Sequence, residues 1–251
     1  MGTVIVLKSP REIERMRAAC RIVSDVLTAL RELIQPGIST YDLERVAADE
    51  ARKRKASCAF KGYHNYPSSL CCSPNSQVVH GLPTKSPLKS GDLLSLDFGI
   101  LYDDYYGDAA ITVPVGEIST AAAALTEATE ASLYAGIEKA RVGNRLGDVC
   151  SAVQQYVENR GYSVVRDFVG HGIGKNLHED PQVPNYGAAG KGVRLKPGMV
   201  LAIEPMVNEK GHEVRVLEDN WTVVTCDGGL SAHFEHTVAI TANGPDILTR
   251  M

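Results

Sequence analysis

The sequence predicts an α+β fold built from two related halves, each with helices followed by strands. The first sign is that apolar residues at helical spacing alternate along the chain with short strand-like runs. The second sign is a repeat, because residues 89–97 line up with residues 196–204 at an offset of 107. Each of these segments reads as a strand that ends on a carboxylate, Asp97 in the first and Glu204 in the second.

The helical regions repeat nearly in step with these strands. Pro36-Gly37 precedes Asp42, and Gly143 precedes Asp148, at an offset of 106. Two matches at almost the same offset indicate an internal duplication. A pseudo-twofold axis between such halves would bring the two strand-ending carboxylates to opposite sides of one centre.

A chain of 251 residues can bury a sizeable core as one large domain or as two smaller ones. The two halves run over about residues 9–115 and 120–245, and no low-complexity linker separates them. We therefore expect a single domain over residues 1–251.

Start and stop signals delimit the first two helices. Ser9-Pro10-Arg11-Glu12 is a capping box with proline at the first helical position, and the apolar periodicity runs to Ile34 before Pro36-Gly37. Ser39 and Thr40 begin a second helix that reaches Ala51. Residues 52–55 are all basic, and we interpret them as a solvated last turn rather than as a nucleic-acid patch.

Residues 93–102 and 105–113 predict a hairpin that turns at Asp103-Asp104. A two-residue loop places positions of opposite parity on the same face, so Asp97 and Asp108 should be diagonal neighbours. Two carboxylates on one buried face repel each other unless a cation lies between them.

The second half repeats the order of helices and strands. Helical patterns cover residues 120–140 and 146–160, and the second of them is closed by Gly161. Strands are expected near Val164 and over residues 199–203, 221–225 and 236–241.

Composition excludes several classes of protein. A net charge of -4 gives no electrostatic reason to expect a specific nucleic acid or an anionic membrane as partner. The sequence contains no membrane-spanning run and no recognisable signal peptide. Six cysteines without a C-x-x-C pair favour free thiols over disulfides or a thiolate zinc site. We therefore expect a cytoplasmic protein.

Four acids and one imidazole suggest a metal site: Asp97, Asp108, His171, Glu204 and Glu235. Each acid lies in an apolar, strand-like run, where an unpaired charge is unfavourable. This much negative charge suits two divalent ions, and the ligand set fits Mn, Fe(II), Co or Zn without deciding among them.

The remaining histidines have other interpretations than metal binding. His80 and His178 remain for contact with a substrate or for proton transfer. His64, His212 and His233 read as surface or hydrogen-bonded polar residues. Any one of the four acids and the one imidazole could also be an ion-paired core residue. All five together in strand-like segments do not fit that interpretation.

Six motifs occur in the order of a known family: residues 62–67, 79–81, the pair Asp97 and Asp108, residues 171–181, 203–206 and 234–237. By these motifs the chain resembles the type I methionine aminopeptidases of the pita-bread metallopeptidase family over nearly its whole length. The resemblance implies a pseudo-symmetric curved antiparallel sheet with four helices outside. It also implies hydrolytic removal of the initiator methionine from nascent proteins whose second residue is small.

The resemblance assigns roles to the metal-site residues. Asp97 corresponds to a ligand of one ion, His171 and Glu204 to ligands of the other, and Asp108 and Glu235 to the bridges. Glu204 also corresponds to the proton acceptor for the attacking water. The resemblance further implies that His178 stabilises the oxygen of the tetrahedral intermediate and that His80 contacts the scissile amide nitrogen.

The family's methionine pocket maps to aromatic and sulfur-bearing side chains of this sequence. Two positions depart from the family pattern: Phe60 stands where relatives carry Cys, and Leu177 stands where relatives carry Phe. The expected substrate-binding residues are Tyr63, Tyr66, Cys71, His80, His178 and Trp221. A monovalent cation is implied near Asn75, Gln77 and Ser231, together with transient contact with the ribosome and a monomeric state.

Two rival readings remain. Prolidases and creatinases share the fold, but they carry an additional N-terminal domain for which there is no room before Ser9. A binding module that kept the fold without catalysis is the other rival, and the presence of all five ligands and both accessory histidines argues against it.

Overall fold

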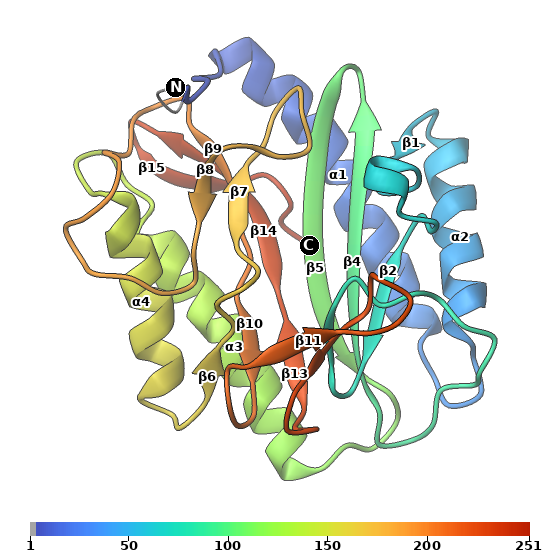
Figure 1. Ribbon diagram of the computed structural model, residues 1–251. Helices are drawn as coiled ribbons and strands as arrows, with labels where there is room; N and C mark the ends of the chain where they lie inside the picture. The colour runs from blue at the N-terminus through green and yellow to red at the C-terminus, as the bar shows by residue number, and fades with distance from the viewer. Residues whose placement is uncertain (1–3) are drawn as a thin grey trace.

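The computed structural model describes residues 4–251. Residues 1–3 of the predicted single domain, 1–251, lie outside the described residues. A nine-stranded sheet dominates the described residues, with the main strand order β1-β4-β5-β14-β9-β7-β8. All of its strand pairs are antiparallel, β2 pairs with β4, and β15 pairs with β14. Two three-stranded sheets, β13-β10-β6 and β11-β12-β3, lie beside it. Figure 1 shows the main sheet as a curved layer with the helices behind it.

The strands are short apart from one hairpin. Their bounds are β1 Ser57–Cys58, β2 Cys71–Pro74, β3 Gln77–Val79, β4 Leu93–Tyr102, β5 Tyr105–Pro114, β6 Ser163–Val164, β7 Gly170–Gly172, β8 Glu179–Val183, β9 Val200–Ile203, β10 Met206–Asn208, β11 Val214–Val216, β12 Val223–Thr225, β13 Ser231–His233, β14 Glu235–Thr241 and β15 Gly244–Ile247.

The four predicted helices are confirmed with ends shifted by at most two residues. They are α1 Pro10–Leu33, α2 Thr40–Lys53, α3 Thr120–Lys139 and α4 Leu146–Glu158. The Ser9 side chain accepts a hydrogen bond from the backbone of Glu12, and the Glu12 carboxylate accepts one from the backbone of Ser9, so the capping box forms. Residues 4–251 also contain one 3-10 turn, η1 Tyr63–Asn65.

All four helices lie on one face of the main sheet. Helix α1 packs against β4 and β5, and α3 packs against β9 and β14, while α2 and α4 pack against α1 and α3 respectively. One apolar cluster joins them, with Leu27 of α1, Ile111 of β5, Ile137 of α3 and Val238 of β14 among its members. Because side chains alternate along a strand, residues of the other parity face away from the helices. Asp108 and Glu235 have that other parity.

The hairpin prediction is confirmed in register as well as in extent. Asp97 pairs with Ala110, and Gly99 pairs with Asp108. Opposite parities therefore share a face, and the two aspartates are diagonal neighbours on β4 and β5.

The repeated segments occupy comparable places in the sheet. Residues 93–97 lie in β4, beside β5, and residues 200–203 form β9, beside β14. Strands β5 and β14 pair with each other between them. The description of the chain as two duplicated halves of one domain stays a prediction that this arrangement favours.

Several strand predictions need correction. The strand expected from Trp221 begins at Val223, because Asp219 accepts hydrogen bonds from the backbones of Trp221 and Thr222 and holds them in a turn. Short strands such as β7, β8 and β10 lack an alternating pattern of their own and form through pairing with distant segments.

All six cysteines are free thiols, as expected, although Cys226 is exposed and Cys58 is only partly buried. In the described residues, no helix is long and apolar enough to cross a bilayer.

Candidate active site

The five predicted metal ligands come from five neighbouring strands. Asp97 lies on β4, Asp108 on β5, Glu235 at the start of β14, Glu204 directly after β9, and His171 in the middle of β7. Backbone pairing sets their spacing, since His171 pairs with Ala202 of β9 and Glu235 pairs with Ala110 of β5. The sheet thus gathers residues that lie up to 138 positions apart in the sequence, the separation between residues 97 and 235.

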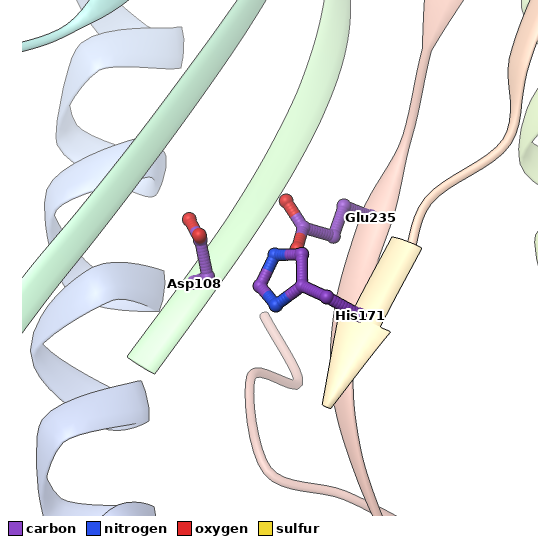
Figure 2. A group of neighbouring side chains, drawn as sticks. All are labelled: Asp108, His171 and Glu235. Carbon is purple, nitrogen blue, oxygen red and sulfur yellow. The ribbon is translucent and has the colours of Figure 1, made fainter. Parts of the chain in front are cut away.

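Three of these side chains converge closely. One ligand atom from each of Asp108, His171 and Glu235 lies within 4.8 Å of the others, and all three residues are buried. Figure 2 shows the three side chains directed toward one another from separate strands. The His171 Nε2 atom lies 3.6 Å from Glu204 Oε1, which brings the fourth ligand to the same place.

His171 presents a free nitrogen lone pair to this cluster. Its Nδ1 atom lies 2.9 Å from the carbonyl oxygen of Gly172, and because a carbonyl can only accept, Nδ1 carries the proton. Burial lowers the pKa of His171 to about 3, so the ring is neutral at pH 7. The unprotonated Nε2 atom is therefore available as a metal ligand.

Three of the four carboxylates each have a buried oxygen without a hydrogen-bond partner. Asp97 Oδ1, Asp108 Oδ1 and Glu235 Oε1 accept no hydrogen bond. Burial raises the pKa of Asp97 to about 7 and that of Glu204 to about 8. Burial, and then the neighbouring carboxylates, raise the pKa of Asp108 and Glu235 well above the usual range.

Such a cluster is unfavourable in isolation, since removing an ionised carboxylate from water is costly unless it is paired or hydrogen-bonded. Divalent cations would neutralise the charge and occupy the unpartnered oxygens. The residues present therefore fit a metal centre, and the donor set of carboxylates with one imidazole suits a first-row transition metal.

A cavity opens onto this cluster and contains every predicted site residue. Its volume is about 190 Å³. The lining residues are Phe60, Tyr63, His64, Tyr66, Cys71, Val79, His80, Asp97, Asp108, His171, Leu177, His178, Glu204, Trp221 and Glu235. The structure thus brings the predicted metal ligands, the two accessory histidines and the predicted pocket residues together.

His178 lies beside the metal ligands and is held by Tyr63. The Tyr63 hydroxyl lies 2.8 Å from His178 Nδ1, and the His178 ring centroid lies 4.2 Å from that of His171. Burial lowers the pKa of His178, which favours the neutral ring. When the hydroxyl donates to Nδ1, the neutral ring carries its proton on Nε2.

The apolar end of the cavity is built from packed rings and one thiol. The rings of Tyr66 and Trp221 meet edge to face at 5.1 Å, and the Tyr66 hydroxyl donates a hydrogen bond to the carbonyl oxygen of Gly81. Cys71 is buried on β2, where it pairs with Asp97. The Phe60 ring fills the space over Gly99, because a Cβ at that glycine would lie 2.6 Å from Phe60 Cε1.

His233 was interpreted wrongly from the sequence as a surface or hydrogen-bonded residue. It is 1% exposed, its Nε2 atom has no hydrogen-bond partner, and that atom lies 3.6 Å from Glu204 Oε2. Each oxygen of Glu204 therefore faces an imidazole, His171 on one side and His233 on the other. No local sequence pattern indicates this placement, because His233 lies on β13 and Glu204 follows β9, and these two strands belong to different sheets.

Fold and site together define a metal-dependent enzyme: a curved antiparallel sheet carries buried acids and an imidazole at the floor of a partly apolar cavity. Residues 14–242 match the model of metallopeptidase family M24. The chain belongs to this family.

Two relatives are similar over their full length. The chain is 52% identical to "Methionine aminopeptidase 1" of Bacillus subtilis over 248 residues, which cover 99% of this chain and 100% of the relative. The crystal structure of methionine aminopeptidase from Thermotoga maritima has a TM-score of 0.97 at 47% identity and covers 99% of this chain and 100% of its own. These likenesses confirm the pita-bread fold that the sequence resemblance implied.

Prolidase from Pyrococcus furiosus shows the same fold at greater distance. Its TM-score is 0.81 at 24% identity, covering 98% of this chain but 66% of that chain. At this identity the likeness concerns the fold alone.

Proposed function

We propose that the chain is a dinuclear metal-dependent aminopeptidase that removes the initiator methionine from nascent proteins when the second residue is small. The observation that carries the proposal is the adjacency of a buried carboxylate and imidazole cluster to an apolar, aromatic cavity. Membership in a metallopeptidase family and similarity to methionine aminopeptidases at about half identity support it.

Asp97, Asp108, His171, Glu204 and Glu235 would hold two divalent ions, with Mn, Fe(II), Co and Zn as the candidates. Asp97 would serve one ion, His171 and Glu204 the other, and Asp108 and Glu235 would bridge them. When bound, the ions supply the positive charge that offsets the carboxylates and that polarises water and the substrate carbonyl.

Glu204 acts as the proton acceptor for the attacking water. Its two carboxylate oxygens each lie 3.6 Å from an imidazole nitrogen, His171 Nε2 and His233 Nε2, which places the carboxylate within the ligand cluster. His178 donates its Nε2 proton in a hydrogen bond to the scissile carbonyl oxygen, where negative charge develops. The Tyr63 hydroxyl holds that ring in the required tautomer through Nδ1.

His80 contacts the scissile amide nitrogen. It lies in the cavity wall directly after β3, its backbone has φ of 59°, and its ring meets Phe168 edge to face at 5.5 Å. Burial lowers its pKa to about 4, so the ring is neutral at pH 7 and can accept or donate a hydrogen bond.

The methionine side chain occupies the apolar end of the cavity, against Tyr63, Tyr66, Cys71 and Trp221. Contacts between a thioether and aromatic rings are favourable but modest, so the shape of the cavity supplies most of the selectivity. The Phe60 ring and Leu177 narrow the same space.

Three further features belong to the proposal. A monovalent cation would bind near Asn75, Gln77 and Ser231, where Gln77 Oε1 is buried without a hydrogen-bond partner. The backbone N–H of Ser231 donates to the carbonyl oxygen of Asn75, which brings two of these residues together. We also infer a cytoplasmic monomer that acts on N-terminal methionine with transient contact with the ribosome.

Release of methionine from a short peptide tests the function directly. The purified protein, freed of metal and reloaded with Mn²⁺ or Co²⁺, should release methionine from Met-Gly-Met-Met and much less from a matched peptide with leucine at position two. His171→Ala should abolish release. If no divalent metal restores release in the wild type, the chain is a binding module rather than a peptidase.

A further inference from the structure

One buried ion pair joins the N-terminal segment to the active-site loop. Lys8 Nζ lies 2.5 Å from Glu179 Oε2, and the two side chains are 3% and 7% exposed. In every other pair of Lys or Arg with an acid among the described residues, both side chains are at least 21% exposed. Lys8 and Glu179 are 171 residues apart, so this contact is purely tertiary.

Glu179 holds the loop that carries two cavity residues. Residues 173–178 connect β7 to β8, and Leu177 and His178 of this loop line the cavity. The other carboxylate oxygen of Glu179, Oε1, accepts a hydrogen bond from the backbone of Asn176. The same side chain therefore holds the loop and binds the buried ammonium group.

The stem of Lys8 also packs on this loop. A Cβ at Gly174 would lie 2.5 Å from Lys8 Cε and 2.6 Å from Glu179 Oε1, so any larger residue at this position would displace one of these two side-chain ends. Loop and lysine therefore pack in direct contact, and a shift of one requires a shift of the other.

Lys8 is itself tied to the main sheet. Its backbone N–H donates to the carbonyl oxygen of Gly198 at 2.7 Å, and the N–H of Gly198 donates to Ile240 of β14 at 2.9 Å. Its ammonium group also donates to the carbonyl oxygen of Val6. A continuous series of contacts thus leads from β14, which carries Glu235, through Lys8 and Glu179 to the loop of His178.

We propose that Lys8 is a positioning residue for His178, acting through Glu179 and the loop of residues 173–178. The inference rests on the proposed function for its catalytic consequence. The hydrogen bond from Tyr63 fixes the rotation of the His178 ring, whereas the Lys8 ion pair fixes the backbone from which that ring projects. Misplacing a catalytic group by about 1 Å can lower the rate about 10²-fold.

Lys8→Met tests this, because methionine keeps an unbranched stem of similar length and removes the charge. On Met-Gly-Met-Met, kcat should fall between about tenfold and about 10²-fold, with KM and metal content close to wild type. In the metal-free protein, amide hydrogen exchange should accelerate in residues 173–180 and stay unchanged in α3 and α4. Arg17→Met, which breaks the ion pair of Arg17 with Asp246, is the matched control and should leave both readouts near wild type.

The double variant Lys8→Met with Glu179→Met separates positioning from the burial of an unpaired charge. It leaves no lone carboxylate in the interior, so it should fold even if the single variant does not. Under the proposal its loop still exchanges rapidly and its kcat stays low. Recovery of wild-type kcat and exchange in the double variant would overturn the proposal, as would a uniform rise in exchange over the whole chain.

The two hypotheses fail in different ways. A wild-type protein that releases no methionine with any divalent metal contradicts the proposed function, while hydrogen exchange still decides whether Lys8 holds the loop. An active wild type with an unaltered Lys8→Met variant contradicts only the role of Lys8.

Discussion

Adding Mn²⁺ to the metal-free protein at pH 7 should release protons from the carboxyl cluster. Burial raises the pKa of Glu204 to about 8 and that of Asp97 to about 7. At pH 7 a group with a pKa of 8 is about nine-tenths protonated, and one with a pKa of 7 is about half protonated. Because a metal ligand must lose its proton, binding should release at least about one proton per chain.

The same shifts determine how stability depends on pH. Raising the Glu204 pKa from 4.5 to about 8 corresponds to about 5 kcal/mol between the two protonation states. The folded metal-free protein then binds more protons than the unfolded chain, so this group's contribution to stability is lost as pH rises from 4.5 through 8. Added Mn²⁺ should therefore raise the melting temperature more at pH 8 than at about pH 5.5.

Calorimetric titration in two buffers of different ionisation enthalpy counts the released protons. Asp108→Asn should lower the count, because it removes a buried acid whose own pKa is raised by burial and by Asp97, and because Asp108 also raises the pKa of Glu235. Asp103→Asn is the matched control on the same hairpin, in the turn where Asp103 pairs with Arg15, and should leave the count unchanged. Tight binding of Mn²⁺ with no proton release in the wild type would refute the reasoning.

Three substitutions test other parts of the structure. His178→Ala should lower kcat on Met-Gly-Met-Met about 10²-fold with metal content unchanged by mass spectrometry, and a metal-free variant would contradict its assigned role. Tyr63→Phe should lower kcat about fivefold, because it removes one hydrogen bond to His178 worth about 1 kcal/mol, and it should leave stability unchanged. A wild-type rate in this variant would show that other contacts hold the His178 ring. Leu96→Ala, in the apolar cluster under α1, should reduce the free energy of unfolding in urea by about 2–5 kcal/mol, and a loss under about 1 kcal/mol would mean that the site collapses around the smaller side chain.

Local chemistry made much of the fold and site predictable from the sequence. A capping box starts α1, and a two-residue turn fixes the parity of β4 against β5. Parity alone placed Asp97 and Asp108 on one face. These features depend on residues close in sequence, where spacing and turn chemistry leave few alternatives.

Other features depend on partners that the sequence does not place. Strand β7 is Gly170–Gly172, and nothing in Gly-His-Gly predicts a strand, because it forms through pairing of His171 with Ala202. The ion pair of Lys8 with Glu179 likewise joins segments 171 residues apart. The burial of His233 beside Glu204 requires both β13 and the end of β9 to be in place.

The proposed metal ligands lie in or directly after paired strands, whereas the other site residues lie in or beside loops. The negative charges of the ligands explain this difference. Mutually repelling carboxylates must be held by backbone pairing on both sides, and four of the five proposed ligands lie within paired strands, with Glu204 directly after β9. Tyr63, His80 and His178 instead lie in or beside loops, and His80 has a left-handed backbone with φ of 59°, a conformation that persists only when its surroundings impose it. Substitutions on the strands should therefore change metal content first, whereas substitutions in the loops or at their anchors should change turnover at unchanged metal content.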